Sequence, residues 1–198
     1  GVALNCVGNG KLLREGPFSK LWIQPASGDS GGALGAALLV WYKYLGNKRT
    51  VSQKGDSQKA SYLGPGYDDA YIEEFLIKEG AGYKKIAYSD LAQTVADLIN
   101  DAKVIGWFEG RMEFGPRALG ARSIIGDARN TEMQSKMNLK IKYRESFRPF
   151  APTILSDKVS DWFNMNVESP YMLLVAQIKE DKKVKVNNES GLKGFDKL

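Results

Sequence analysis

Three arginines stand close together in a stretch that is otherwise rich in small residues. The stretch GRMEFGPRALGARS, residues 110–123, holds Arg111, Arg117 and Arg122 together with three glycines and one proline. Guanidinium groups bind phosphate and carboxylate oxygens through paired hydrogen bonds, and glycines let a backbone approach a ligand closely. The stretch therefore predicts an anion-binding loop, with a solvated charged face as the plain alternative.

The basic residues of the chain are concentrated in and after this stretch. Residues 111–148 contain nine lysines and arginines but four aspartates and glutamates, whereas the rest of the chain contains nineteen of each kind. The net charge of +5 therefore belongs to this window. Its second half, NLKIKYRESFRPFAP (138–152), adds Lys140, Lys142, Arg144 and Arg148, and Lys142 shares a helical face with Asn138. Two such clusters favour a polyphosphate over a single carboxylate.

A glycine-rich turn near the start offers a second candidate anion site. In PASGDSGGALGAAL, residues 25–38, a turn with Gly31 and Gly32 separates an apolar run from an expected helix. Such a turn presents free backbone N–H groups to a phosphate, although a close-packed turn without a ligand has the same composition. Asp29 within the turn is a candidate helix cap or metal ligand.

The composition excludes several kinds of chemistry for this chain. It contains no histidine, the usual general base and the commonest transition-metal ligand. Its single cysteine, Cys6, excludes an internal disulfide and fits a reducing cytoplasm. No apolar run approaches about 18 residues, so no membrane-spanning helix is expected. No nucleophilic serine or cysteine motif is present, so catalysis would rest on charge stabilisation and positioning, as in phosphoryl or adenylyl transfer.

The apolar pattern predicts an α/β fold that would position these loops. The expected strands are short apolar runs, at 21–26, 84–89, 103–110, 123–128 and 171–178. The expected helices have helical spacing or capping residues, at 33–45, 68–80, 89–103, 131–142 and 156–163. The stretch 110–123 then follows a strand end, where α/β folds bind ligands. Pro116 suits the first position of a helix, which would place Arg117 in a first turn.

Three segments are expected along the chain. Residues 1–46 are apolar and rich in small residues, residues 47–66 are polar without periodicity and are interpreted as a linker or exposed loop, and residues 67–198 form an α/β unit. The polar stretch 179–194 is expected to be a mobile loop. The chain starts without methionine, so we expect a piece of a longer protein.

Four motifs in order carry a resemblance to a known family. GVALNCVGNGKL, PASGDSGGALGAAL, GWFEGRMEFGPRALGARSI and KIKYRESFRPFAP together resemble the NodU/CmcH carbamoyltransferase family, from Gly1 to about Ile178. The resemblance implies the C-terminal end of an actin-like ATPase/sugar-kinase-type domain in residues 1–46 and a truncated YrdC-like α/β domain in residues 67–198. It implies an enzyme that makes carbamoyl adenylate from carbamoyl phosphate and ATP. The carbamoyl group would then pass to a hydroxyl of a small-molecule or sugar acceptor.

The resemblance also implies roles for single residues. Arg117 in GPRALG and Lys142 in KIKYRE match positions that meet carbamoyl phosphate or the adenylate, and they are the candidate catalytic residues. The wider candidate set for substrate and nucleotide binding consists of Arg117, Arg122, Asn138, Lys142, Arg144, Arg148, Gly31 and Gly32.

A metal is also implied by the resemblance. Asp29 matches an aspartate that joins histidines at a divalent ion, expected to be iron or a similar metal, and Mg²⁺ would accompany ATP. The histidines would lie outside this chain, and the fragment alone is expected to be inactive as a carbamoyltransferase.

Two other functions remain open at this point. One is a YrdC-type synthase that makes a carbamoylated adenylate from threonine and bicarbonate for tRNA modification. The other is a non-catalytic nucleotide- or RNA-binding module. The GDSGGALGAA motif beside GPRALG favours the carbamoyltransferase over both. Nucleic acid is not expected as a partner because no RNP-type or helix-turn-helix pattern is present, no membrane partner is expected, and a homodimer is an open alternative to a monomer.

Overall fold

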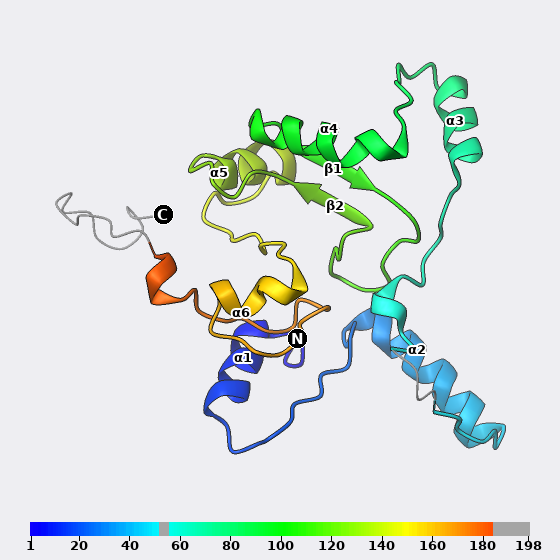
Figure 1. The fold of residues 1–198 in the computed structure, drawn as a ribbon. Helices are drawn as coiled ribbons and strands as arrows, with labels where there is room; N and C mark the ends of the chain where they lie inside the picture. The colour runs from blue at the N-terminus through cyan, green and yellow to red at the C-terminus, as the bar shows by residue number, and fades with distance from the viewer. Residues whose placement is uncertain (52–55, 184–198) are drawn as a thin grey trace. The chain divides into compact units, whose positions relative to one another are not determined.

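The computed structural model describes residues 1–51 and 56–183 and combines short helices with one small sheet (Figure 1). This mixture agrees with the expected α/β class. The chain forms two compact units. The first consists of Gly1–Lys84, Trp107–Ser123 and Ser169–Val175, and the second takes the remaining residues. Each unit contains residues from several parts of the chain.

Helix α1 (Cys6–Glu15) opens the first unit. The side chain of Asn5 caps it by accepting a hydrogen bond from the Gly8 N–H at 3.0 Å. Gly10 is buried, and a Cβ atom there would lie 2.3 Å from the carbonyl oxygen of Val175. The missing side chain therefore lets α1 pack directly on the segment 169–175, where the Asn9 amide donates to the Leu173 carbonyl at 3.1 Å.

The other helical elements described in the first unit are α2, η1, η2 and α3. Helix α2 (Asp29–Leu39) continues into a π-helical turn, η1 (Val40–Tyr44), and a short 3-10 turn, η2 (Lys59–Ser61), follows. Helix α3 (Asp69–Lys78) starts at Asp68, whose carboxylate accepts from the Tyr71 N–H at 2.8 Å. It stops before Gly80, which has a φ of +64°. The helices expected at 33–45 and 68–80 are confirmed.

Strands β1 (Ile105–Phe108) and β2 (Arg122–Ile125) pair in a two-stranded sheet and confirm the strands expected at 103–110 and 123–128. The strands expected at 21–26, 84–89 and 171–178 are wrong, since the structure gives these segments no strand. Ala26 and Leu173 are nevertheless buried, at 7% and 6% exposed. The runs 21–26 and 171–178 therefore each contain a buried residue without strand pairing, whereas the residues of 84–89 are mostly exposed.

The second unit contains helix α4 (Tyr88–Asn100), helix α5 (Met133–Met137) and a π-helical turn, η3 (Asn138–Lys142). A 3-10 turn, η4 (Ser156–Lys158), helix α6 (Val159–Trp162) and a 3-10 turn, η5 (Glu180–Lys182), follow. The helices expected at 89–103, 131–142 and 156–163 are confirmed. Met133 and Met137 are buried, and a Cβ on Gly126 would lie 2.8 Å from the sulfur of Met137.

The segment 47–66 is the one expected to be a linker. Its second half packs against other residues of the first unit. Ser61 is 2% exposed, and the Tyr62 hydroxyl donates to the carbonyl of Leu119 at 2.5 Å. Residues 52–55 of that segment, and the part of the expected tail loop from residue 184 onward, lie outside the described residues.

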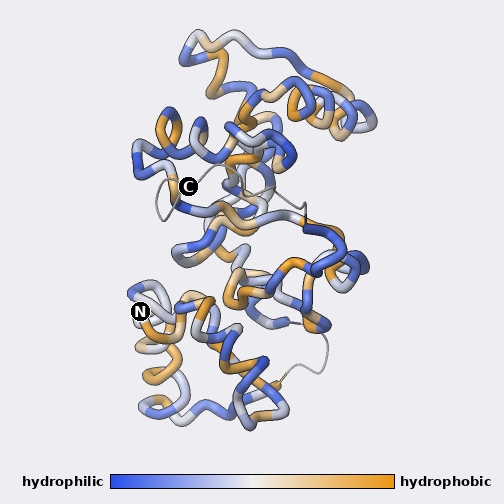
Figure 2. The backbone as a smooth tube through the Cα atoms, turned by 90° about the vertical axis from the view of Figure 1, so that its left-hand side faces the viewer, coloured by the Kyte–Doolittle hydropathy of each residue, from blue (hydrophilic) through white to orange (hydrophobic). Residues whose placement is uncertain are grey.

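Polar and apolar residues alternate along the helices, as Figure 2 shows by colour. Within the described ranges, every helix is too short or too polar to cross a membrane.

Candidate functional site

Most of the stretch with three arginines forms the loop between β1 and β2, which we call the GPRALG loop (residues 109–121). The loop holds Arg111 and Arg117, and Arg122 is the first residue of β2. It contains no helix, so the helix start expected at Pro116 is wrong. Gly110, Gly115 and Gly120 have φ values of +56°, +123° and +108°, a region that residues with a side chain rarely adopt. The glycines are therefore needed for the path of the loop.

A buried glutamate holds this loop together. Glu113 is 7% exposed, and its Oε1 accepts hydrogen bonds from the backbone N–H groups of Leu119 at 2.6 Å and Ala121 at 2.8 Å. The N–H of Arg122 approaches the same oxygen at 3.3 Å. Burial alone would raise the pKa of Glu113, but these donors outweigh it and hold the pKa below its ordinary value. Sequence reasoning missed Glu113, which carries no local signal of its own.

The lowered pKa of Glu113 predicts how the loop responds to acid. A carboxyl group whose pKa is lowered by folding contributes stability above its ordinary pKa and loses that contribution as the pH falls through the lowered value. We expect the N–H groups of Leu119 and Ala121 to be protected from hydrogen exchange at pH 7 and to lose protection in acid, after correction for intrinsic rates. In Glu113→Gln the protection of these N–H groups should be weaker and independent of pH. If protection in the wild-type protein were also independent of pH through the acid range, the prediction would be contradicted.

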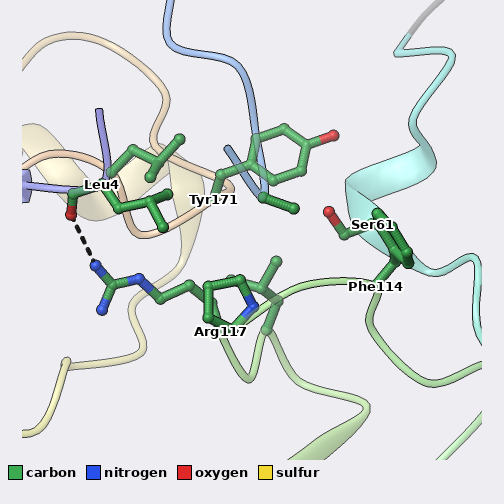
Figure 3. Close-up of a pocket in the computed structure, with 9 residues that line it drawn as sticks. Leu4, Ser61, Phe114, Arg117 and Tyr171 are labelled. Atoms are coloured by element: carbon green, nitrogen blue, oxygen red, sulfur yellow. Dashed lines mark hydrogen bonds between the residues drawn. The ribbon is translucent and has the colours of Figure 1, made fainter. Parts of the chain in front are cut away.

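Arg117 lies beside a small cavity of about 10 Å³. Figure 3 shows its side chain running along the cavity to Leu4, whose carbonyl accepts from Nη2 at 3.1 Å, with Ser61 and Phe114 at the other end. The Nε atom of Arg117 is buried, and no residue of the described ranges accepts its hydrogen. The cavity has room for about one water molecule. It can therefore hold a single acceptor atom for the Arg117 Nε–H group but not a nucleotide.

The GPRALG loop meets the glycine-rich turn of PASGDSGGALGAAL in the first unit. A Cβ on Gly115 would lie 2.7 Å from the Cβ of Ala26, and a Cβ on Gly31 would lie 2.3 Å from the Ala26 carbonyl oxygen. Ala26 itself has a φ of +54°. The two motifs therefore pack closely at Gly115, where only glycine fits. Within the turn itself, only glycine fits at Gly31. Gly32 has open space where its side chain would be.

Asp29 is the first residue of α2 and is exposed. The residue at the cap position is Gly28, and no side chain caps this helix, so the cap expected at Asp29 is not formed. Within residues 1–51 and 56–183, no cluster of three or more His, Cys, Asp or Glu residues is present. The described residues therefore do not by themselves fit a metal site.

Arg111 and Arg122 point their guanidinium groups at main-chain carbonyls. Arg122 donates from Nη1 to the carbonyls of Glu109 and Ala121, each at 2.9 Å, and from Nη2 to that of Gly110 at 3.2 Å. Its guanidinium carbon lies 3.5 Å from the centre of the Phe108 ring. Arg111 donates to the carbonyl of Leu63 at 3.1 Å. These contacts brace the loop on both sides.

The second basic cluster surrounds the π-helical turn η3 in the second unit. Asn138 is fully buried; its amide donates to the carbonyls of Ser146 at 2.9 Å and Arg148 at 2.8 Å. Its oxygen accepts from Arg144 Nε at 2.6 Å, and the Arg144 guanidinium lies over the ring of Phe150. The structure thus brings Asn138, Arg144 and Arg148 together in one turn, which we call the basic turn (residues 138–150).

The basic turn presents two exposed lysines, Lys140 and Lys142. Tyr143 follows with a φ of +50° in the left-handed region, which ends the helical path. In this π-helical turn Ile141 faces outward: it is 43% exposed, whereas Met133 and Met137 are buried. Arg148 pairs with Glu145 at 2.7 Å on the surface.

Replacing Asn138 by alanine should loosen the basic turn. The change leaves two carbonyls and Arg144 Nε without their partner, and each such buried loss costs about 1–3 kcal/mol. We expect trypsin to cleave the intact protein after Arg144 roughly 5 to 150 times faster when cleavage follows transient opening. Asn164→Ala, a change at an exposed asparagine of the same unit, is the control. Equal cleavage rates for the two variants would show that Asn138 does not hold the turn.

In both basic segments a buried polar side chain, Glu113 or Asn138, fixes the backbone of a turn that carries arginines. Comparison with known proteins gives the family. The sequence model described as "Carbamoyltransferase C-terminus" matches residues 96–190, and the one described as "Carbamoyltransferase N-terminus" matches residues 1–38. The chain belongs to the carbamoyltransferase family, which confirms the resemblance.

Several relatives are similar over most of this chain. Nodulation protein NolO of Bradyrhizobium diazoefficiens is 41% identical over 186 residues, which is 92% of this chain and 33% of the relative. Nodulation protein NolNO of Sinorhizobium fredii is 40% identical over 187 residues, 92% of this chain and 27% of the relative. An uncharacterized protein of Synechocystis is 56% identical over 201 residues, 100% of this chain and 32% of the relative. The chain spans about a third of the length of the curated relatives it matches.

Proposed function

We propose that this chain is part of an ATP-dependent O-carbamoyltransferase. In the proposed reaction water releases phosphate from carbamoyl phosphate to leave carbamate, whose oxygen attacks the α-phosphorus of ATP to form carbamoyl adenylate and release pyrophosphate. The carbamoyl group then passes to a hydroxyl of a small-molecule or sugar acceptor, and AMP leaves. Membership of the carbamoyltransferase family and the +5 surplus in residues 111–148 support this proposal. The single cysteine fits a cytoplasmic enzyme.

The observation that carries the proposal is a buried N–H group on the Arg117 side chain that is unpaired within the described ranges. Its loop is fixed from inside by Glu113, yet its buried Nε has no acceptor among the described residues. Buried donors are nearly always paired, so this guanidinium N–H calls for an acceptor in the adjacent cavity, which has room for one water molecule or one ligand oxygen. A phosphate or carbamoyl oxygen is an acceptor of the right kind.

The residues have separate roles in this proposal. Arg117 and Lys142 neutralise charge on carbamoyl phosphate and on the phosphates of ATP, which lowers the barrier to adenylyl transfer. Arg144 and Arg148 add positive charge at the basic turn. Asn138 acts as a positioning residue, because it is fully buried and its amide is used within the turn.

The glycine-rich turn is proposed to lie near the nucleotide in the first of two catalytic regions. Residues 1–46 would be the C-terminal end of an actin-like ATPase-type domain, and residues 67–198 part of a YrdC-like domain. In this picture Gly31 and Gly32 lie near the nucleotide, and Arg122 braces the GPRALG loop without touching ligand. Asp29 is proposed as one ligand of a divalent metal whose other ligands lie outside this chain. No step of the reaction is assigned to that metal.

The test of the proposal is pyrophosphate release by the full-length protein with ATP. Formation of an adenylate displaces pyrophosphate from the α-phosphorus of ATP, so release should depend on added carbamoyl phosphate. Threonine plus bicarbonate should not replace it. Release supported by threonine and bicarbonate would favour the tRNA-modifying synthase, and ATP binding without release would favour a non-catalytic module; either result overturns the proposal.

A further inference from the structure

Glu113 stands out as a buried carboxylate inside a loop that also carries Arg111 and Arg117. Its Oε1 collects the N–H groups of Leu119, Ala121 and Arg122, which lie on both sides of Gly120. A cradle of consecutive backbone N–H groups is an anion-binding feature in many proteins. Here the anion is part of the loop itself, so these N–H groups are not available to a phosphate.

Glu113 binds backbone N–H groups, so Arg117 and Arg122 make their contacts with other partners. Among the described residues, no lysine or arginine side chain is recorded as a hydrogen-bond or ion-pair partner of this carboxylate, whose contacts are backbone N–H groups. Arg122 donates to backbone carbonyls, and Arg117 donates to Leu4 and keeps a buried N–H without an acceptor. The carboxylate therefore fixes the backbone on the C-terminal side of Arg117 without neutralising its charge.

We propose that Glu113 is a positioning residue of the carbamoyltransferase reaction, which acts through the GPRALG loop on Arg117. The carboxylate closes the loop from residue 113 to residue 121 and so sets the direction in which the Arg117 side chain leaves it. The inference deepens the proposed function and rests on it, because the gain from a fixed Arg117 appears only when an anionic substrate binds there.

The test is a double-mutant cycle in the full-length protein, followed by carbamoyl-phosphate-dependent pyrophosphate release. Glu113→Gln keeps an oxygen in place but weakens charge-assisted bonds by roughly half, so we expect about a tenfold loss of kcat/KM. Glu113→Gln in an Arg117→Ala background should cause no further loss, because the residue through which Glu113 acts is gone. Glu109→Gln, the same charge change at an exposed residue of the same loop, should leave kcat/KM unchanged.

The cycle separates positioning from general destabilisation. A tenfold loss that persists in the Arg117→Ala background would mean that Glu113 does not act through Arg117, and the inference would be overturned. Tighter binding of carbamoyl phosphate by Glu113→Ala would also overturn it, because the carboxylate would then be blocking an anion site.

If the proposed carbamoyltransferase function is wrong, the experiment gives a result that differs from failure of the Glu113 inference. Wild-type protein would then release no pyrophosphate with carbamoyl phosphate. The anchoring by Glu113 is still tested in that case by hydrogen exchange at Leu119 and Ala121. Exchange should accelerate in Glu113→Gln and not in Glu109→Gln, and equal rates in both variants would contradict the anchoring.

Discussion

Arg117→Ala in the full-length protein is expected to slow carbamoyl-phosphate-dependent pyrophosphate release by roughly 10- to 150-fold. This range corresponds to the loss of one hydrogen-bonded charged contact, about 1.5–3 kcal/mol. The physical reason is that Arg117 carries a buried Nε without an acceptor in the described residues, on a loop fixed by Glu113. Initial rates with saturating ATP and varied carbamoyl phosphate measure the effect.

Two further variants make the Arg117 result specific. Arg117→Lys keeps the charge but loses the planar fork, so we expect it to recover only part of the rate. Arg111→Ala removes the same charge from the same loop, but its guanidinium donates to the carbonyl of Leu63, so its effect should stay within about threefold. An unchanged rate in Arg117→Ala would remove this residue from the site.

Lys142→Ala is the second change with a large expected effect. Lys142 is exposed at the end of the π-helical turn η3, where a lysine supplies a compact point charge suited to a triphosphate. We expect kcat/KM for ATP to fall by about 10- to 100-fold, mostly through a higher KM if the contact is made equally in the ground and transition states.

Lys140 provides a matched control for Lys142. It is an exposed lysine two residues earlier on the same π-helical turn, so Lys140→Ala removes the same charge at nearly the same place. We expect it to change kcat/KM for ATP by less than about threefold, as for a screened surface charge. Equal losses for the two variants would mean that only the net charge of the turn matters.

The helices with strong local signals were predictable from the sequence. The segment 68–80 has an acidic start and a glycine stop, and the structure forms α3 between Asp68 and Gly80. The segment 89–103 has helical spacing, and α4 covers most of it. The structure begins this helix at Tyr88, and Ala87 occupies the cap position without a side-chain bond.

The wrong strands share one physical cause. An apolar run such as 171–178 indicates that some of its residues are buried. Leu173 is 6% exposed, whereas Val175 and Ile178 are 39% and 44% exposed. A strand also requires a partner with matching hydrogen bonds, which a single run of sequence does not specify. In the described residues the run 171–178 forms an isolated bridge between Ile178 and Phe163 and no strand.

The candidate site was predictable in its residue types but not in its construction. The arginines and glycines of the GPRALG loop were found because their composition is unusual. The helix start at Pro116 was wrong because the N–H groups of Leu119 and Ala121 are bound by Glu113, and Gly115 and Gly120 take positive φ values. Contacts between residues six and eight positions apart follow no helical or strand period, so no local pattern indicated them.

The central claim is that this chain serves an enzyme that makes carbamoyl adenylate. The most direct measurement incubates the full-length protein with ATP and ¹³C-labelled carbamoyl phosphate, without acceptor, and analyses the products by mass spectrometry and ¹³C NMR. The account predicts a labelled carbamoyl adenylate that appears together with pyrophosphate and is strongly reduced in Arg117→Ala. Loss of labelled carbamoyl phosphate, or its persistence, with no labelled adenylate and no pyrophosphate would contradict it.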